Sequence, residues 1–196
     1  MEHTLQAHET SELIEQPEGD KLKTRTALTI SFFAMVLAFA SLGGSNTAKE
    51  ATQENILAAN AYSFYQAKAI RQTSMKIAAT DLELQLLRDT AMPADVKEVF
   101  KKKIEDYKKT ADRYESEPET NDGKKELMVR AKAHEAARDY ALRQDPWFDY
   151  AEGMVQIAIV LLSVSLIGSI PALFLAGSAL GALGLLCTIN GFFLII

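Results

Sequence analysis

The last 44 residues of the chain, Gly153–Ile196, contain no Asp, Glu, Lys, Arg or His. As one helix this run would extend for about 66 Å at ~1.5 Å per residue, roughly twice the ~30 Å hydrocarbon core of a bilayer. We therefore expect it to cross a membrane twice, with Pro171 near the turn. A second uncharged stretch, Thr26–Ala48, is long enough for one more crossing. The absence of charged residues from these two long stretches predicts an integral membrane protein.

Cysteine is almost absent. The single cysteine, Cys187, excludes an intramolecular disulfide, so cysteine usage does not indicate a redox compartment. Its position inside the last apolar run is typical of a small apolar residue in a helix.

The residue patterns of catalytic and metal sites are also missing. The three histidines, His3, His8 and His134, have no metal-ligand spacing, and the chain has no glycine-rich phosphate loop. Asp81 and Glu83 are two residues apart, so on a helix they point to different sides and make a poor acid–base pair. We predict no catalytic residue, no cofactor and no metal, and therefore no enzyme.

An excess of basic charge is absent as well. Residues 45–152 carry 18 Lys and Arg against 20 Asp and Glu, and the net charge of the chain is −5. Nucleic-acid binding requires a clustered basic excess, so we do not expect it. The apolar runs contain no ionisable residue, which argues against a pump or a coupled transporter.

Helix breakers are rare in the middle of the chain. Between residues 45 and 146 only Pro93, Pro118 and Gly123 occur, and they predict boundaries between helices. The predicted helices cover about residues 47–89, 93–115 and 124–144. The pair Gly43-Gly44 leaves two alternatives open: a new helix starting at the capping-box spacing Thr47–Glu50, or one continuous helix leaving the membrane.

A seven-residue repeat of mainly apolar residues runs along the first of these helices, as is typical of a coiled coil. The repeat consists of Ile56, Ser63, Ile70, Ile77 and Leu84, with small Ala67 and Ser74 between them. The second helix has one continuous apolar stripe, formed by Val96, Phe100, Ile104, Tyr107, Ala111 and Tyr114. Neither helix is apolar enough to fold alone in water, so we expect an antiparallel bundle, completed within the chain or by a neighbouring subunit.

These patterns predict an all-α protein with three transmembrane helices and a coiled-coil-like helical hairpin or bundle inserted between the first and second spans. The predicted parts are an acidic flexible tail at 1–25, a first span at 26–44, a helical domain at 45–146, and a transmembrane hairpin at 147–196. Within the hairpin the spans cover about 153–170 and 172–196.

The first span has two interpretations. Lys21, Lys23 and Arg25 before an apolar run are typical of a secretory signal, but the long acidic segment ahead of them favours an uncleaved anchor. These charges, against only Lys49 close behind the span, favour a cytoplasmic N-terminus, while four basic residues before the second span argue the other way. We expect a multi-pass protein of the inner membrane with its N-terminus in the cytoplasm.

The third span carries a face of small residues. Spacings of 4, 3, 4 and 3 place on one side of the helix Gly177, Gly181, Gly184, Thr188 and Gly191. Such a face allows helix backbones to approach closely in lipid. It serves either to join subunits or to pack against the second span of the same chain.

Aromatic residues gather at two places. Trp147, Phe148 and Tyr150 precede the second span, where aromatic rings anchor a helix at the lipid headgroups. The other cluster lies in the segment 61–72 of the middle domain, which we consider a candidate interaction segment. Its notable residues are Tyr62, Phe64, Tyr65, Lys68 and Arg71. They are suited to cation–π contacts or docking, or equally to a helix–helix core.

The same segment carries a resemblance. An apolar span, Gly43-Gly44, a turn rich in Glu and Asn, and then the string from Phe64 to Gln72 resemble a family of small bacterial membrane proteins, domain of unknown function 4337. The resemblance extends over most of the chain after Lys21. It implies a protein with three spans and a helical middle in a bacterial inner membrane, and it implies no activity.

The function that we expect is therefore structural. The leading hypothesis is a non-enzymatic protein that contacts membrane lipids and associates with itself through its middle helices and the glycine face. A second hypothesis is an accessory subunit bound to other membrane protein subunits. A third is a pore or small-solute conduit, although the predicted spans carry glycine where a pore needs a polar stripe.

Overall fold

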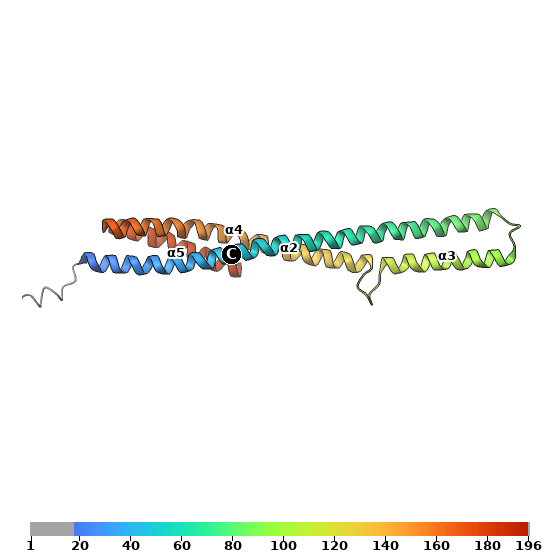
Figure 1. Ribbon diagram of the computed structural model, residues 1–196, viewed down its shortest axis with the longest axis horizontal. Helices are drawn as coiled ribbons and strands as arrows, with labels where there is room; N and C mark the ends of the chain where they lie inside the picture. Colours follow the sequence, from blue (N-terminus) through green and yellow to red (C-terminus); the bar gives the residue numbers. More distant parts are fainter. Residues whose placement is uncertain (1–17, 196) are drawn as a thin grey trace, which may run out of the picture. The chain divides into compact units, whose positions relative to one another are not determined.

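A computed structural model describes residues 18–195 (Figure 1). Four helices follow one another without any strand in this part of the chain: α2 (Glu18–Arg88), α3 (Ala94–Glu115), α4 (Lys124–Gly168) and α5 (Pro171–Phe193). The all-α class and the order of the helices agree with the predictions from the sequence. Of the predicted acidic tail at 1–25, residues 1–17 lie outside the described residues, as do His3 and His8, and the remainder begins α2.

The chain divides into two units. Unit 1 contains residues 18–49 and 140–195, and unit 2 contains Glu50–Asp139. Two of the helices, α2 and α4, contribute residues to both units. The predicted parts at 26–44 and 147–196 fall in unit 1, and most of the predicted part at 45–146 forms unit 2.

Two sequence breakers lie inside helices. The pair Gly43-Gly44 is within α2, which is the second of the two alternatives for this pair. Pro146 is within α4, so the expected helix end near residue 144 is wrong. A proline removes one helical hydrogen bond. Here Ala141 and Phe148, on either side of Pro146, are both buried in unit 1, so packing holds the helix on both sides of the proline.

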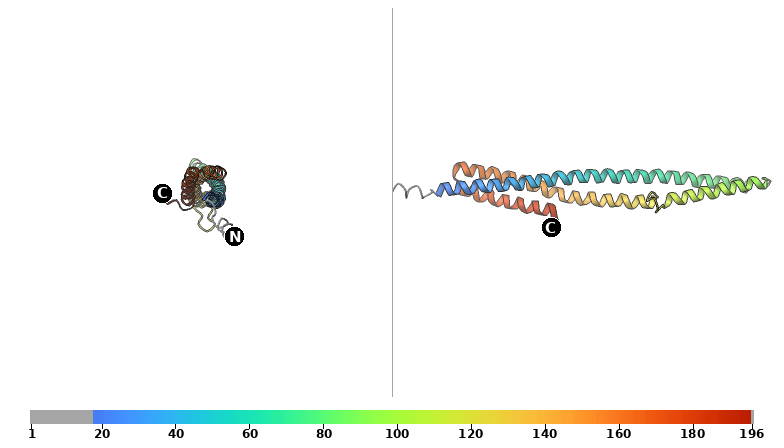
Figure 2. Two further views of the ribbon diagram at one scale, coloured as in Figure 1. Left: turned by 90° about the vertical axis from the view of Figure 1, so that its left-hand side faces the viewer. Right: turned by 60° about the horizontal axis from the view of Figure 1, so that its bottom comes forward.

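The α4 and α5 helices form a hairpin, visible in both views (Figures 1 and 2). Ser169 adopts a left-handed conformation between them, with a φ of 51°. The Ile170 N–H donates a hydrogen bond of 3.3 Å to the carbonyl oxygen of Ser165, which satisfies part of the end of α4, and the Ser165 hydroxyl donates one of 2.8 Å to the carbonyl oxygen of Ile170. Pro171 then occupies the first turn of α5, where its missing N–H costs nothing.

The core of unit 1 contains few large side chains. Phe33 and Val36 of α2 pack with Val155 and Leu162 of α4. Elsewhere the helices meet through alanine and glycine, while many large apolar side chains point outward. The helices α2, α4 and α5 are each long and apolar enough to cross a membrane.

Unit 2 is built along the second half of α2. Both α3 and the first part of α4 lie beside it (Figures 1 and 2). Ile104 and Ala111 of α3 are buried, as are Leu127 and Ala131 of α4. The contacting face of α2 is small, with Ala58, Ala61 and Ala79 buried, so the other helices approach it closely.

Candidate interaction surface on α2

The predicted interaction segment is divided between two faces of α2. Tyr65 and Lys68 turn toward the ends of α3 and α4, where they take part in the contacts described below. Phe64 is 62% exposed on the outer side, and Arg71 is exposed as well. The Tyr62 hydroxyl donates a hydrogen bond to the Glu135 carboxylate, and this bond raises the pKa of Tyr62. The segment therefore fastens the bundle on one side and remains accessible on the other.

The inward face holds a polar cluster centred on Gln72, which is only 5% exposed. Its amide nitrogen donates to the carbonyl oxygen of Ala111 at 3.0 Å and to the Glu115 carboxylate at 2.9 Å. Its amide oxygen accepts from Lys124 at 2.9 Å, and Lys124 also pairs with Glu115 at 3.0 Å. We call Lys68, Gln72, Glu115, Asp122 and Lys124 the clasp, because they join α2 to both neighbouring helices.

Lys68 completes the clasp. Its ammonium group pairs with Asp122 at 2.6 Å and lies 5.5 Å from the centre of the Tyr114 ring. Lys124 lies at the same distance from the Tyr65 ring. The expected cation–π contacts thus do occur, but across helices and not between neighbours within the segment.

The clasp lowers the pKa of Glu115 below its ordinary value of 4.5. The hydrogen bond from Gln72 is the largest cause, followed by the bond from Lys124. Both favour the ionised carboxylate. Gln72 was not among the predicted site residues, although it ends the string that carries the family resemblance. The signal that could have identified it is its position on the small-residue face of α2, one helical turn from Lys68.

The loop between α3 and α4 is closed by Glu126. Its carboxylate accepts from the Ser116 hydroxyl at 2.6 Å and from the Glu117 N–H at 3.2 Å. The bond from Ser116 is the main reason why the pKa of Glu126 is lowered. At Gly123 a Cβ atom would lie 2.4 Å from the Glu117 nitrogen, so only glycine permits this close approach.

The outward face of α2 carries the predicted seven-residue repeat. Ile70 and Ile77 are 68% and 64% exposed, and Ile56, Ser63 and Leu84 are exposed as well. Of the two alternatives for the bundle, the chain itself does not cover this repeat, and completion by a neighbouring subunit stays a prediction. Alanines occupy the core within the chain because close helix packing leaves no room for isoleucine there.

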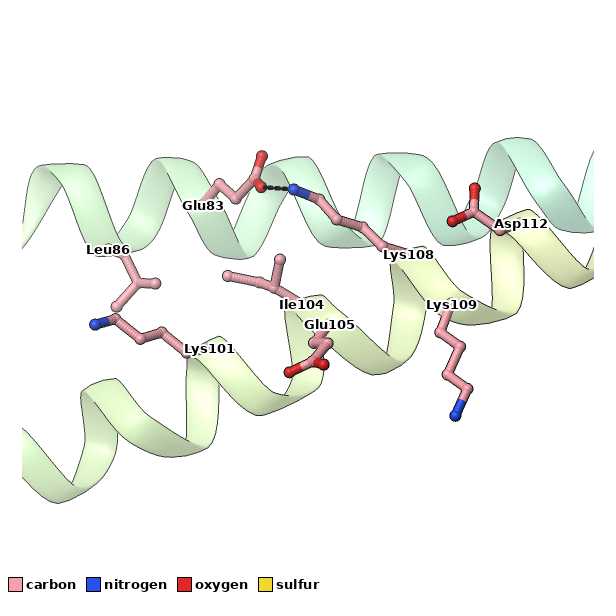
Figure 3. A pocket seen from close by; sticks show the side chains of 8 residues that line it. All are labelled: Glu83, Leu86, Lys101, Ile104, Glu105, Lys108, Lys109 and Asp112. Carbon is pink, nitrogen blue, oxygen red and sulfur yellow. Dashed lines mark ion pairs between the residues drawn. The ribbon is translucent and has the colours of Figure 1, made fainter.

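A groove of about 610 Å³ lies between α2 and α3 (Figure 3). Leu86 and Ile104 lie between its polar walls, and Glu83 pairs with Lys108 across it at 2.6 Å. The lining includes three lysines and three acidic residues, so the groove has no preference for charge of one sign. The α3 stripe is partly covered, with Ile104 and Ala111 buried and Val96, Phe100, Tyr107 and Tyr114 half-buried.

His134 contacts one carboxylate. Its Nδ1 lies 2.6 Å from Glu54 across the α2–α4 contact. Within residues 18–195 no group of three or more His, Cys, Asp or Glu side chains is arranged to hold a metal ion. The cysteine, Cys187, is half-buried in α5.

The glycine face of α5 is covered by the chain itself. All five of its residues are buried: Gly177, Gly181, Gly184, Thr188 and Gly191. A Cβ at Gly177 would lie 3.1 Å from the Ala158 carbonyl oxygen, and one at Gly184 would lie 3.2 Å from the Ala151 carbonyl oxygen. A Cβ at Gly181 would meet the ring of Phe33 on α2. In this structure the face packs α5 against α4 and α2.

Phe148 is 1% exposed, so its ring does not extend to the surface as a headgroup anchor would. The ring lies against Gly43, where a Cβ would come within 2.3 Å of it, and against Gly191. The ring of Phe192 makes an edge-to-face contact with the Phe148 ring, with the two ring centres 4.9 Å apart. We call Gly43, Gly191 and the Phe148 ring between them the glycine socket. Sequence reasoning missed it because these residues are far apart along the chain. Trp147 is half-buried and Tyr150 is 58% exposed, so their role as anchors stays a prediction.

Comparison with protein-family models matches residues 22–194 to the family described as domain of unknown function (DUF4337). The match covers nearly the whole chain, and the protein belongs to this family. No curated protein and no solved structure matches the chain.

Proposed function

We propose that this member of the family is a non-enzymatic, multi-pass membrane protein whose unit 2 serves to bind protein, in the first place further copies of itself. Family membership adds no activity. The proposal is therefore argued from the surfaces of the two units.

The distribution of side chains in unit 1 supports the membrane part of the proposal. Its buried positions include polar residues, namely Thr26, Gln144, Ser165, Thr188 and Asn190. Its exposed positions include Phe39, Leu175 and Ile167. Large apolar side chains on the surface are unfavourable in water and favourable in lipid, where helices associate through small residues and hydrogen bonds. This distribution favours lipid as the solvent of unit 1.

The orientation follows from the basic residues near the first span. Lys21, Lys23 and Arg25 precede the apolar part of α2, and Lys49 alone follows closely. By the positive-inside rule the N-terminus faces the cytoplasm. Together with the resemblance to bacterial proteins, this leads us to propose a multi-pass protein of the inner membrane.

The observation that carries the proposed binding role is the exposed apolar repeat of α2. Unit 2 carries its charges on the surface, as a water-exposed unit does. Yet Ile56, Ile70, Ile77 and Leu84 leave a row of apolar side chains uncovered, interrupted by Ser63. Exposed apolar stripes of this kind mark protein–protein contacts. The second candidate function, an accessory subunit of a larger complex, uses the same stripe with a different partner.

Purification in mild detergent, after cross-linking in native membranes, tests the proposal. A ladder of homo-oligomers is the expected result. One heterologous band in place of the ladder would favour the accessory subunit. A lone monomer, both in membranes and after purification, would overturn the binding role as a whole.

A further inference from the structure

We infer that two copies of this chain associate through α2 as a parallel, in-register coiled coil. This inference rests on the proposed function, and it names the contact surface, the partner and the direction of pairing.

The pairing surface follows from a heptad register with position a at Ile56. Positions a and d then form one exposed set, which we call the α2 seam: Ile56, Ala59, Ser63, Gln66, Ile70, Thr73, Ile77, Thr80, Leu84 and Leu87. Every one of these ten residues is exposed in the isolated chain. The a and d positions are those that meet the partner helix in a coiled coil.

The opposite face of α2 follows the same register. Positions c and f are all buried or half-buried: Ala58, Ala61, Tyr65, Lys68, Gln72, Met75, Ala79, Leu82 and Leu86. One helix thus carries two seams of the same period. The c/f seam is covered by α3 and α4 of its own chain, and the α2 seam is not. A second copy can therefore approach the α2 seam without displacing any contact within unit 2.

The seam is long enough for a stable pair. From Ile56 to Leu87 it extends for about 46 Å at ~1.5 Å per residue, or about four and a half heptads. Sustained coiled coils need about three to four heptads. Isoleucine at a with leucine at d favours two-stranded pairing, and in this seam Leu87 is the one leucine at d. The polar d residues Gln66, Thr73 and Thr80 weaken the pair and help to set its register.

The charges beside the seam select a second copy in parallel orientation. In a parallel pair each g residue faces the e residue five positions later in the partner helix. Here Lys76 faces Asp81 of the second copy, and Glu83 faces Arg88 of the second copy. Both pairs are attractive, and the register creates no pair of like charges. Within its own chain Glu83 contacts Lys108 through one carboxylate oxygen, at 2.6 Å (Figure 3).

Membrane insertion imposes the same direction. The helix that carries the seam, α2, also contains the first apolar run. Copies inserted with one orientation present α2 in the same direction, so their seams meet in parallel and at the same height. The ordering entropy of association is reduced because the helices are already aligned.

Site-directed cross-linking tests the register. In a Cys187→Ala background, Ile56→Cys and Leu84→Cys are introduced singly into the full-length protein, and membranes are treated with a short thiol-to-thiol cross-linker. Both variants should form homodimers, because each position meets itself only in a parallel, in-register pair. The matched control is Val99→Cys, an equally exposed apolar position on α3 that should remain monomeric.

Two further sets of variants test the surface and the charges. Ile77→Glu should reduce the mass in detergent to that of the monomer, and Val99→Glu should not, with circular dichroism confirming that both remain helical. Lys76→Glu should weaken the dimer by about fivefold, and the double variant Lys76→Glu/Asp81→Lys should restore it.

The inference is overturned if Ile56→Cys and Leu84→Cys cross-link no more than Val99→Cys does. It is equally overturned if only one of the two reacts, since an antiparallel or shifted pair would do that. A heterologous partner lost in Ile77→Glu would overturn the homodimer but leave the proposed binding role intact. No association of any kind would overturn both.

Discussion

Unit 1 and unit 2 are both helical, yet they place their large apolar side chains differently. In unit 1 such residues are exposed on all three helices, for example Phe39 on α2, Ile167 on α4 and Leu175 on α5. In unit 2 they are concentrated on α2, with Val99 and Val129 as the exceptions on α3 and α4. The exposed apolar side chains on every helix of unit 1 are the observation behind the proposed lipid solvent, whereas the single stripe on the otherwise charged unit 2 is the observation behind the proposed protein partner.

The interiors differ in the same sense. Unit 1 is held by glycine contacts and by the Phe148 ring packed against Gly43 and Gly191, the kind of close helix packing that is typical of helices in lipid. Unit 2 combines alanine contacts with the charge-compensated clasp around the buried Gln72. The two units should therefore respond differently to the same kind of substitution.

The largest effect is expected in the glycine socket. Phe148→Ala should destabilise unit 1 by about 3–5 kcal/mol, because the ring is fully packed and its removal leaves a cavity. The measurement is the thermal unfolding midpoint in mild detergent. Tyr150→Ala, two residues away but exposed, should change stability by less than about 0.5 kcal/mol. Equal losses in the two variants would contradict the socket.

Overfilling the same socket should have a smaller effect. Gly43→Leu inserts a side chain where a Cβ already lies 2.3 Å from the Phe148 ring, and should destabilise by about 1–3 kcal/mol. Because the clash is with the ring, the double variant Gly43→Leu/Phe148→Ala should be more stable than Phe148→Ala alone. Additive losses in the thermal midpoint would show that the two residues do not share a site.

Unit 2 offers the counterpart in the clasp. Gln72→Ala removes the hydrogen bonds that join α2 to the Ala111 carbonyl oxygen, to Glu115 and to Lys124, and should destabilise by about 1–3 kcal/mol. Hydrogen exchange of the full-length protein in detergent should accelerate at residues 111–126 and remain unchanged in α5. The exposed Gln53→Ala serves as control. Unchanged protection in Gln72→Ala would remove the clasp from the account of unit 2.

Lowering the pH should destabilise unit 2, and this is the smallest of the four expected effects. The pKa of Glu115 and that of Glu126 are lowered from 4.5 in the folded protein. A lowered pKa stabilises the fold above the unfolded value, and this contribution is lost as the pH falls below about 4.5 through the folded pKa. Protection at residues 111–126 should decrease in that range.

Variants of single carboxylates check the origin of that acid effect. Glu115→Gln should reduce the pH dependence of exchange at residues 111–126, because it removes one of the titrating groups. Glu119→Gln, an exposed carboxylate in the same loop, should leave it unchanged. An identical profile for both variants would place the acid effect elsewhere.

Much of the fold follows from local patterns. The three apolar helices, the helical middle and the turn near Pro171 were all predicted, because span length and helix breakers are properties of a few neighbouring residues. The continuation of α4 past residue 144 and the residues that form the core of unit 2 were not predicted. A proline such as Pro146 does not end a helix that tertiary packing holds on both sides.

The candidate surface was only half predictable. The heptad repeat of α2 is visible in the sequence, but a period does not reveal which partner covers it. Two seams with the same period run along α2, and only the positions of α3 and α4 decide that the c/f seam is covered and the α2 seam is exposed.

The amino-acid order alone established that the chain is helical, that three stretches are apolar enough to cross a membrane, and which family it belongs to. Folding decided the rest: that Gly43 receives the ring of Phe148, that Gln72 holds the ends of α3 and α4, and which side of α2 remains open. The physical reason is distance along the chain. Hydropathy and helix propensity act between near neighbours, whereas packing depends on residues that only the folded structure brings into contact.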